Sequence, residues 1–272
     1  MAKLISYGNR IRRGKYLLHS TFKSAANFSS EDDFVFVVNR AVGAGPLNAV
    51  LEDFDPDTLS TLEVLDDYLC LNEERILFDD STLYDSTFEL AELDERRFGR
   101  NLQFFENTLE KLAPKKSLTF LIDDGREAEF SSIFELEFVK RCREGCAKIF
   151  SDDFLEGIKI LKGLGPGLTP SGDDFISGTL IALNLFQKIR QVDYSKTIRQ
   201  IYEMARGDNP FTNAFLDCAA QGLLFEKFKR LISALLVSNE PELIDSTKHL
   251  LEIGETSGAD QAVGFIIGLK RF

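Results

Sequence analysis

The chain has 272 residues, of which 44% are hydrophobic and 28% are charged, as in ordinary globular proteins. Its formal net charge of −12 argues against nucleic-acid binding, because an acidic surface repels phosphate backbones. Neither a membrane span nor a signal peptide is expected, because no apolar run is long enough, and we predict a cytoplasmic protein.

The first half of the chain is predicted to consist mainly of β-strands. Residues 34–38 are β-branched and aromatic, and a Gly/Pro break separates them from a second apolar run at 47–51. This pattern predicts two strands around a tight turn. Apolar residues at helical spacing predict a helix over 96–112, with Pro114 just beyond its end. Further short strands are expected at 75–79, 83–88 and 118–122.

From about residue 131 onward the pattern becomes helical. The change predicts an α+β protein in which a strand-rich N-terminal domain, residues 1–128, packs on an all-helical C-terminal domain, residues 129–272. Helices are expected over 133–150, 154–161, 175–189, 195–205, 211–219, 223–237, 241–251 and 259–269.

A glycine-rich segment at 163–178 is the strongest candidate for a binding site. Closely spaced glycines and prolines predict a rigid, irregular loop that lets a ligand approach the backbone, and an apolar helix follows it. The start of a helix offers unpaired N–H groups and a positive dipole end, which favour anions. The donors predicted to bind substrate are Gly165, Gly167, Thr169, Ser171 and Gly172.

Helix capping is the alternative interpretation of part of this segment. Ser171 followed by Asp174 three residues later fits a capping box with Ser171 as the N-cap. Capping accounts for these two residues, but it leaves the density of glycines and the second acid, Asp173, without a reason.

The C-terminal region repeats the theme. Five identities at one fixed offset relate the segment that begins at Ser171 to the one that begins at Ser257, and they predict an internal repeat. Each copy places a glycine, Gly178 or Gly264, early in a helix, where glycine weakens the helix by about 1 kcal/mol relative to alanine. We therefore expect the two helices to cross near these glycines and to bring both helix starts to one pocket.

Three acids, Asp173, Asp174 and Asp260, are expected in that pocket, and we predict catalytic roles for them. Three carboxylates beside an anionic ligand repel it unless something offsets their charge. Either some of them only cap helices, or Mg²⁺ held by Asp173 and Asp174 bridges to the ligand, or one acid is protonated or orients a substrate amide. These alternatives remain open on sequence alone. Since only two histidines are present, nucleophile–histidine mechanisms are disfavoured.

Two more segments carry side chains suited to binding. Arg40 precedes a Gly/Pro turn that ends at Asn48, and guanidinium groups bind carboxylates well. The second segment, 209–213, precedes a helix of small residues, and its polar groups serve either as a helix cap or as part of the site.

Taken together, these segments resemble one family. The run Gly-Leu-Gly-Pro-Gly-Leu-Thr-Pro-Ser-Gly-Asp-Asp-Phe at 163–175 is similar to the signature of the AllH-like proteins, and the motifs at 45–48 and 257–260 are similar to others of that family. The resemblance spans residues 34–272. At Asn213 the chain departs from the Ser or Thr expected there.

The resemblance implies a subunit of oxamate carbamoyltransferase, a complex of anaerobic purine (allantoin) catabolism that also contains FdrA-like and AllG-like subunits. Its reaction converts oxalurate and phosphate into oxamate and carbamoyl phosphate. On this basis the glycine loop is expected to bind phosphate or the carbamoyl group, and Arg40 the substrate carboxylate. The predicted substrate-binding residues also include Asn48, Thr212 and Ser257, from the segments at 45–48, 209–213 and 257–260. The alternatives are a non-catalytic assembly subunit and a free-standing small-molecule enzyme with the same anion pocket.

Overall fold

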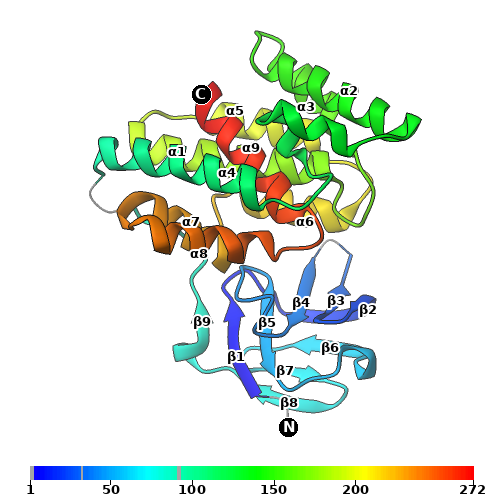
Figure 1. Cartoon of the computed structure of the whole chain (residues 1–272). Helices are drawn as coiled ribbons and strands as arrows, with labels where there is room; N and C mark the ends of the chain where they lie inside the picture. Colours follow the sequence, from blue (N-terminus) through cyan, green and yellow to red (C-terminus); the bar gives the residue numbers. More distant parts are fainter. Residues whose placement is uncertain (1–2, 32, 91–92) are drawn as a thin grey trace. The chain divides into compact units, whose positions relative to one another are not determined.

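The structure is a computed structural model that describes residues 3–31, 33–90 and 93–272. It has a strand-rich N-terminal part and a helical C-terminal part, which confirms the α+β prediction (Figure 1). The chain divides into a strand unit, Met1–Phe88 with Leu223–Lys229, and a helical unit, Glu89–Gly222 with Arg230–Phe272. The first long helix and the segment after it thus group with the helices. The proposed domain boundary between residues 128 and 129 stays a prediction.

The strand unit contains one nine-stranded sheet with the order β8-β7-β6-β2-β3-β4-β5-β1-β9. All neighbouring strands are antiparallel except β4–β5 and β1–β9, which are parallel. The tight turn predicted between the runs at 34–38 and 47–51 is therefore wrong. A tight turn would make the two strands antiparallel, whereas the connection between them carries the chain back so that β5 runs parallel to β4. The strands are Lys3–Gly8 (β1), Gly14–Phe22 (β2), Ala25–Ser29 (β3), Phe34–Val38 (β4), Asn48–Glu52 (β5), Thr61–Val64 (β6), Tyr68–Leu71 (β7), Glu74–Leu77 (β8) and Leu83–Tyr84 (β9).

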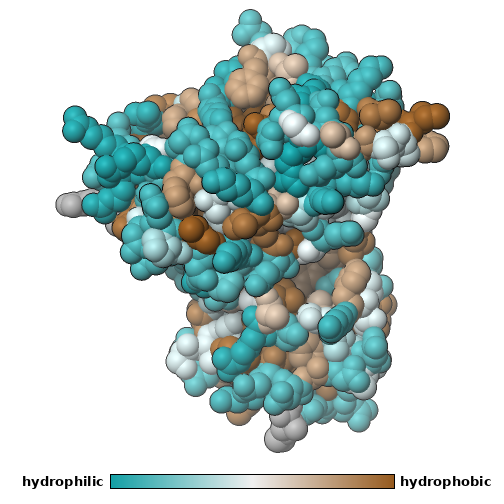
Figure 2. All heavy atoms as spheres, viewed as in Figure 1, coloured by the Kyte–Doolittle hydropathy of each residue, from teal (hydrophilic) through white to brown (hydrophobic). Residues whose placement is uncertain are grey.

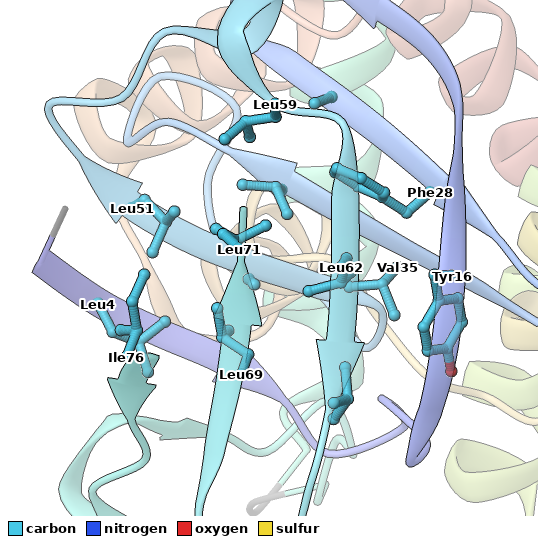
Figure 3. Packing of buried hydrophobic residues seen from close by; sticks show 14 residues of the cluster. Leu4, Tyr16, Phe28, Val35, Leu51, Leu59, Leu62, Leu69, Leu71 and Ile76 are labelled. Carbon is cyan, nitrogen blue, oxygen red and sulfur yellow. The ribbon is translucent and has the colours of Figure 1, made fainter. Parts of the chain in front are cut away.

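One face of this sheet buries the core of the strand unit. Side chains from distant strands, among them Phe28 on β3, Leu51 on β5 and Leu62 on β6, pack together and are almost fully buried (Figure 3). Their alternation with more exposed neighbours along β6 and β7 follows from the two-residue period of a strand. Burial of this apolar area is the main driving force for folding the strand unit.

The helical unit is built around two buried helices, α4 (Ser171–Arg190) and α9 (Ser257–Arg271). Almost every residue of their first three turns is buried, as expected of helices that are covered on all sides. The remaining helices are α1 (Glu95–Leu112), α2 (Ile133–Ile149), α3 (Phe154–Leu161), α5 (Ser195–Ala205), α6 (Pro210–Ala220), α7 (Glu226–Val237) and α8 (Glu240–Leu251).

One predicted strand is wrong in kind. Residues 118–122 do not extend but form a 3-10 helix, Leu118–Leu121, whose side chains are mostly buried. A short apolar run fits a buried turn of helix as well as a strand, so its periodicity could not separate the two. Among the described residues, no helix combines the length and apolar character needed to cross a bilayer.

Candidate functional site

The starts of α4 and α9 come together, as the repeat predicts. A Cβ placed on Gly178 would overlap the carbonyl oxygen of Gln261, and one placed on Gly264 would overlap the carbonyl oxygen of Phe175. The two helices therefore cross backbone to backbone at these glycines, which no side chain would allow. The hydroxyl of Thr179 adds a hydrogen bond to the Gly264 carbonyl at 3.2 Å.

The repeat extends backward into the preceding helices. Gly172 touches the backbone at Leu161, where α3 ends, and Gly258 touches the backbone at Leu250, near the end of α8. Each of these glycines donates its N–H to a carbonyl of the connection before it: Gly172 to Leu164 at 2.8 Å, and Gly258 to Ile253 at 3.0 Å. The helix pairs α3–α4 and α8–α9 are thus two copies of one hairpin. Because its N–H is already bonded, Gly172 serves packing rather than ligand binding.

The capping box predicted for Ser171 and Asp174 is wrong. Pro170 occupies the N-cap position, and Ser171 is the first residue of α4. The backbone N–H groups of Asp173 and Asp174 both donate to the Pro170 carbonyl, at 2.9 and 3.0 Å. The sequence pattern is the same in a capping box and in a helix that begins one residue earlier, so the pattern alone did not distinguish them.

Two acids at the helix starts, Asp174 and Asp260, instead lie beside hydroxyl groups that belong to the other helix. Asp174 on α4 lies beside the hydroxyls of Ser257 and Thr169. Asp260 on α9 lies beside those of Ser171 and Thr256, and its Oδ1 accepts the Leu118 N–H at 2.6 Å. Each acid thus faces the serine that opens the other copy of the repeat.

Both acids are buried, Asp174 to 5% exposure and Asp260 to 0%. Burial raises the pKa of Asp174 well above its usual value, and the nearby charge of Asp260 adds to this, while the Ser257 and Thr169 hydroxyls act in the opposite direction. Burial also raises the pKa of Asp260 to about 6, against the opposing effects of the Leu118 N–H and the two hydroxyls. Within the described part of the chain, the Oδ2 atoms of both acids lack a hydrogen-bond partner. Two buried carboxyl oxygens without a hydrogen-bond partner are unusual in folded proteins.

Asp173 differs from these two acids. Its Oδ1 accepts the N–H of Gly163 at 2.9 Å and so ties the first turn of α4 to the start of the glycine loop. Burial raises the pKa of Asp173, while the Gly163 N–H and the charge of Lys162 lower it. Its contacts are those of a loop anchor.

The glycine loop that connects α3 to α4 is four residues longer than the loop that connects α8 to α9. Residues 162–170 form the first connection and residues 252–256 the second. Gly165 and Gly167 have φ values of 107° and 99°, a region that favours glycine. Among the hydrogen bonds of the described residues, the N–H groups of Gly165, Gly167, Leu168 and Thr169 have no acceptor within the chain.

The loop is held in place from two sides. The Thr169 and Ser257 hydroxyls lie 3.1 Å apart, so the loop meets the start of α9. The Leu168 carbonyl accepts the Asn209 side-chain amide at 2.8 Å and the Thr212 hydroxyl at 3.4 Å. Asn209 is also the N-cap of α6. Thr212 is therefore joined to the loop, where it positions the Leu168 carbonyl.

Two predicted substrate-binding residues lie in the strand unit and have structural partners there. Asn48 is almost fully buried, and its amide donates to the Gly43 carbonyl at 2.8 Å, which closes the loop before β5. Arg40 is exposed and pairs with Glu52 at 3.2 Å. Their predicted roles toward a ligand stay predictions.

The predicted magnesium ligands do not fit the ion. Within the described ranges, no group of three or more His, Cys, Asp or Glu side chains is arranged to hold a metal ion. Asp173 is used by Gly163, and burial favours the neutral acid at Asp174. Mg²⁺ prefers an octahedral set of charged and neutral oxygens, which these two acids alone do not supply.

A known protein family matches the part of the chain that contains the glycine loop and the two crossed helices. The model of the family described as oxamate carbamoyltransferase subunit AllH matches residues 161–269, which begin at the end of α3 and end in α9. The match contains the glycine loop and both helix starts. No solved structure matches the chain.

Proposed function

Since residues 161–269 belong to the AllH-like family, we propose that the protein is a subunit of a carbamoyltransferase and binds a small anionic substrate at the glycine loop. The transfer is of the oxamate/oxalurate type, with phosphate as acceptor, in purine (allantoin) catabolism. FdrA-like and AllG-like subunits are the proposed protein partners.

The observation that carries this proposal is the set of unpaired loop N–H groups next to the crossed acids. Gly165, Gly167 and Thr169 supply backbone donors whose geometry is fixed by positive φ angles and by the Asn209 contact. Fixed donors stabilise negative charge better than water does, because they need no reorganisation. Such a set suits phosphate or the oxygen of a carbamoyl group.

Asp174 and Asp260 supply the acid–base part of the proposed mechanism. In the transfer, a phosphate oxygen attacks the carbamoyl carbon, the bond from that carbon to the oxamate nitrogen breaks, and the nitrogen takes up a proton. A buried acid with a raised pKa keeps such a proton to higher pH than an exposed acid does. We assign the delivery of this proton to Asp174. The attacking monohydrogen phosphate gives up its own proton as the new bond forms, and we assign the acceptance of that proton to Asp260. The Ser171 and Ser257 hydroxyls orient the two acids.

A second candidate, the non-catalytic assembly subunit, is favoured by one surface feature. The first turn of α2 exposes Ile133 to 84% and Phe134 to 89%, and Figure 2 shows apolar side chains gathered over one end of this helix. Exposed apolar clusters mark protein contacts. The two candidates are compatible, because a subunit can both bind substrate and dock on a partner.

Titration calorimetry of the purified chain with phosphate and with carbamoyl phosphate tests the proposal. We expect binding to the unchanged protein and a loss of about tenfold or more in Gly167→Ala, since a side chain at φ 99° distorts the donors. Asp174→Asn keeps the shape of the side chain but holds no transferable proton, so binding is expected to persist while transfer by the assembled complex is lost.

Gly163→Ala is the matched control. Gly163 also has a positive φ, 68°, and a Cβ there meets nothing within 4 Å, yet it lies before the unpaired donors. Binding should therefore change little in this variant. Equal affinity in the unchanged protein and in Gly167→Ala, or no binding to either, would reject the glycine loop as an anion site.

A further inference from the structure

A surface hollow of mixed charge lies at the start of the glycine loop. Its lining includes Lys162, the first residue of the loop, together with Arg206, Glu203 and Asp208 from the end of α5 and the connection that follows it. Two cationic and two anionic side chains thus share one depression. Within the described ranges, no ion pair joins these four side chains to each other.

The floor of the hollow is rigidly built. Asn213 on α6 accepts the N–H of Gly207 at 3.0 Å and donates to its carbonyl at 2.8 Å, which clamps the backbone between Arg206 and Asp208. Lys162 donates to the Arg206 carbonyl, and its Cε would lie 3.1 Å from a Cβ on Gly207. The Arg206 guanidinium rests over the Tyr202 ring at 5.6 Å. Held side chains of this kind lose little entropy when they bind a ligand.

The hollow and the glycine loop are neighbours at both ends of the loop. Lys162 leads directly into Gly163, whose N–H is bonded to Asp173. At the far end, Asn209 directly follows Asp208 of the hollow and holds the Leu168 carbonyl of the loop at 2.8 Å. A ligand seated in the hollow therefore lies next to whatever the loop binds.

We infer that this hollow holds the carboxylate-and-amide end of the substrate, with Lys162 and Arg206 binding the carboxylate and Glu203 and Asp208 accepting the amide N–H groups. The inference rests on the proposed function and deepens it, because it places the second half of a substrate whose transferred group is bound by the loop. It also gives Asn213 a role, as the residue that shapes the hollow. In this arrangement Arg206, instead of Arg40, binds the substrate carboxylate.

The test is a set of calorimetric titrations of the full chain with oxamate, oxalate and inorganic phosphate. Oxamate carries a carboxylate and an amide, whereas oxalate carries two carboxylates and no N–H. We expect oxamate to bind more tightly than oxalate. Arg206→Gln and Lys162→Met should each weaken oxamate by about tenfold or more, since each removes a charged partner. Glu203→Gln with Asp208→Asn should remove the preference for oxamate over oxalate.

Matched controls come from α3 and α5, the two helices that end just before Lys162 and Arg206. Lys159→Met on α3 and Arg199→Gln on α5 make the same charge changes on exposed residues outside the hollow, and oxamate affinity should stay within about twofold in both. Failure of the unchanged protein to bind oxamate, or unchanged oxamate affinity in Arg206→Gln, overturns the inference. Phosphate reports on the loop separately: if phosphate binds and Gly167→Ala abolishes it while oxamate fails, the proposed function stands and the hollow does not.

Discussion

At the scale of single residues, the most consequential feature is the buried pair Asp174 and Asp260. An isolated ionised carboxyl is costly to bury, so the folded protein holds protons on these groups that the unfolded chain releases. For a carboxyl whose folded pKa is raised, stability is highest below the unfolded pKa. It falls as the pH rises toward the folded pKa.

Asp260→Asn should remove this pH dependence. The pKa of Asp260 rises from 3.8 to about 6 on folding, so the wild-type protein loses stability between about pH 4 and pH 6 through this group, while asparagine stays neutral. A shift of this size corresponds to about 3 kcal/mol. When the free energy of unfolding is measured in denaturant, the difference between the variant and wild type should increase by roughly this amount from pH 4 to pH 7.

Asp193→Asn provides a control of opposite sign. Asp193 is exposed, and hydrogen bonds from Ser195 lower its pKa, so it stabilises the fold above its usual pKa and loses that effect in acid. Its variant should therefore lose stability at pH 7 and match wild type in acid. Parallel stability curves for wild type and Asp260→Asn would show that Asp260 carries no raised pKa.

At the scale of elements, the crossing of α4 and α9 organises the helical unit. The contact depends on Gly178 and Gly264, each of which faces the backbone of the other helix. This explains why each helix accepts a residue that weakens it. Because the helices meet at the level of the backbone, the hydroxyls and acids of their first turns lie within reach of each other.

Gly264→Ala should therefore be strongly destabilising. The added methyl group would overlap the Phe175 carbonyl, and the two buried helices would have to separate. We expect a loss of about 3 kcal/mol or more in the free energy of unfolding, or failure to fold.

Gly99→Ala is the matched control, since Gly99 lies in α1 with open space around its Cα, and alanine there should stabilise the helix by up to about 1 kcal/mol. Thermal denaturation of both variants measures the difference. Similar melting temperatures for the two would mean that the helices do not cross at Gly264.

Much of this element-level organisation was predictable from the sequence. Helical spacing predicted α3 and α5 at their observed bounds, and the repeat predicted the crossing of α4 and α9. The start of α4 was misplaced because a serine followed by an acid looks the same whether the serine caps the helix or begins it. The sequence could not predict that each acid lies beside the serine of the other helix. That arrangement depends on how two helices whose first residues, Ser171 and Ser257, are 86 positions apart approach each other in space.

At the scale of the whole molecule, the strand unit is not one continuous stretch of chain. Residues 223–229 belong to it although they follow the helical segment. The Leu224 N–H donates to the Ser86 carbonyl at 2.8 Å, and Ala44 and Glu226 exchange hydrogen bonds. A Cβ on Gly45 would overlap the Phe225 ring, so this loop is shaped around the returning segment. Local sequence patterns carry no signal for such a long-range return, and this is why the sequence divided the chain only once.

A fragment of residues 1–88 should accordingly be less stable than the same fragment joined to residues 223–229 through a flexible linker. The shorter fragment loses the hydrogen bonds at Ser86 and Ala44 and exposes the loop at Gly45. We expect the joined fragment to melt at a temperature higher by about 5 °C or more, measured by circular dichroism. The joined fragment with Glu226→Ala should lie between the two. Equal melting temperatures for all three would show that the returning segment adds nothing to the strand unit.

The paired hairpins α3–α4 and α8–α9 also bear on how such a protein arises. Two copies of one hairpin that cross at matching glycines have the arrangement of a symmetric dimer whose halves have been fused into a single gene. In a symmetric dimer the two equivalent connections would have the same length. Here one connection has nine residues and the other five, so the two copies of the hairpin offer different surfaces at their helix starts.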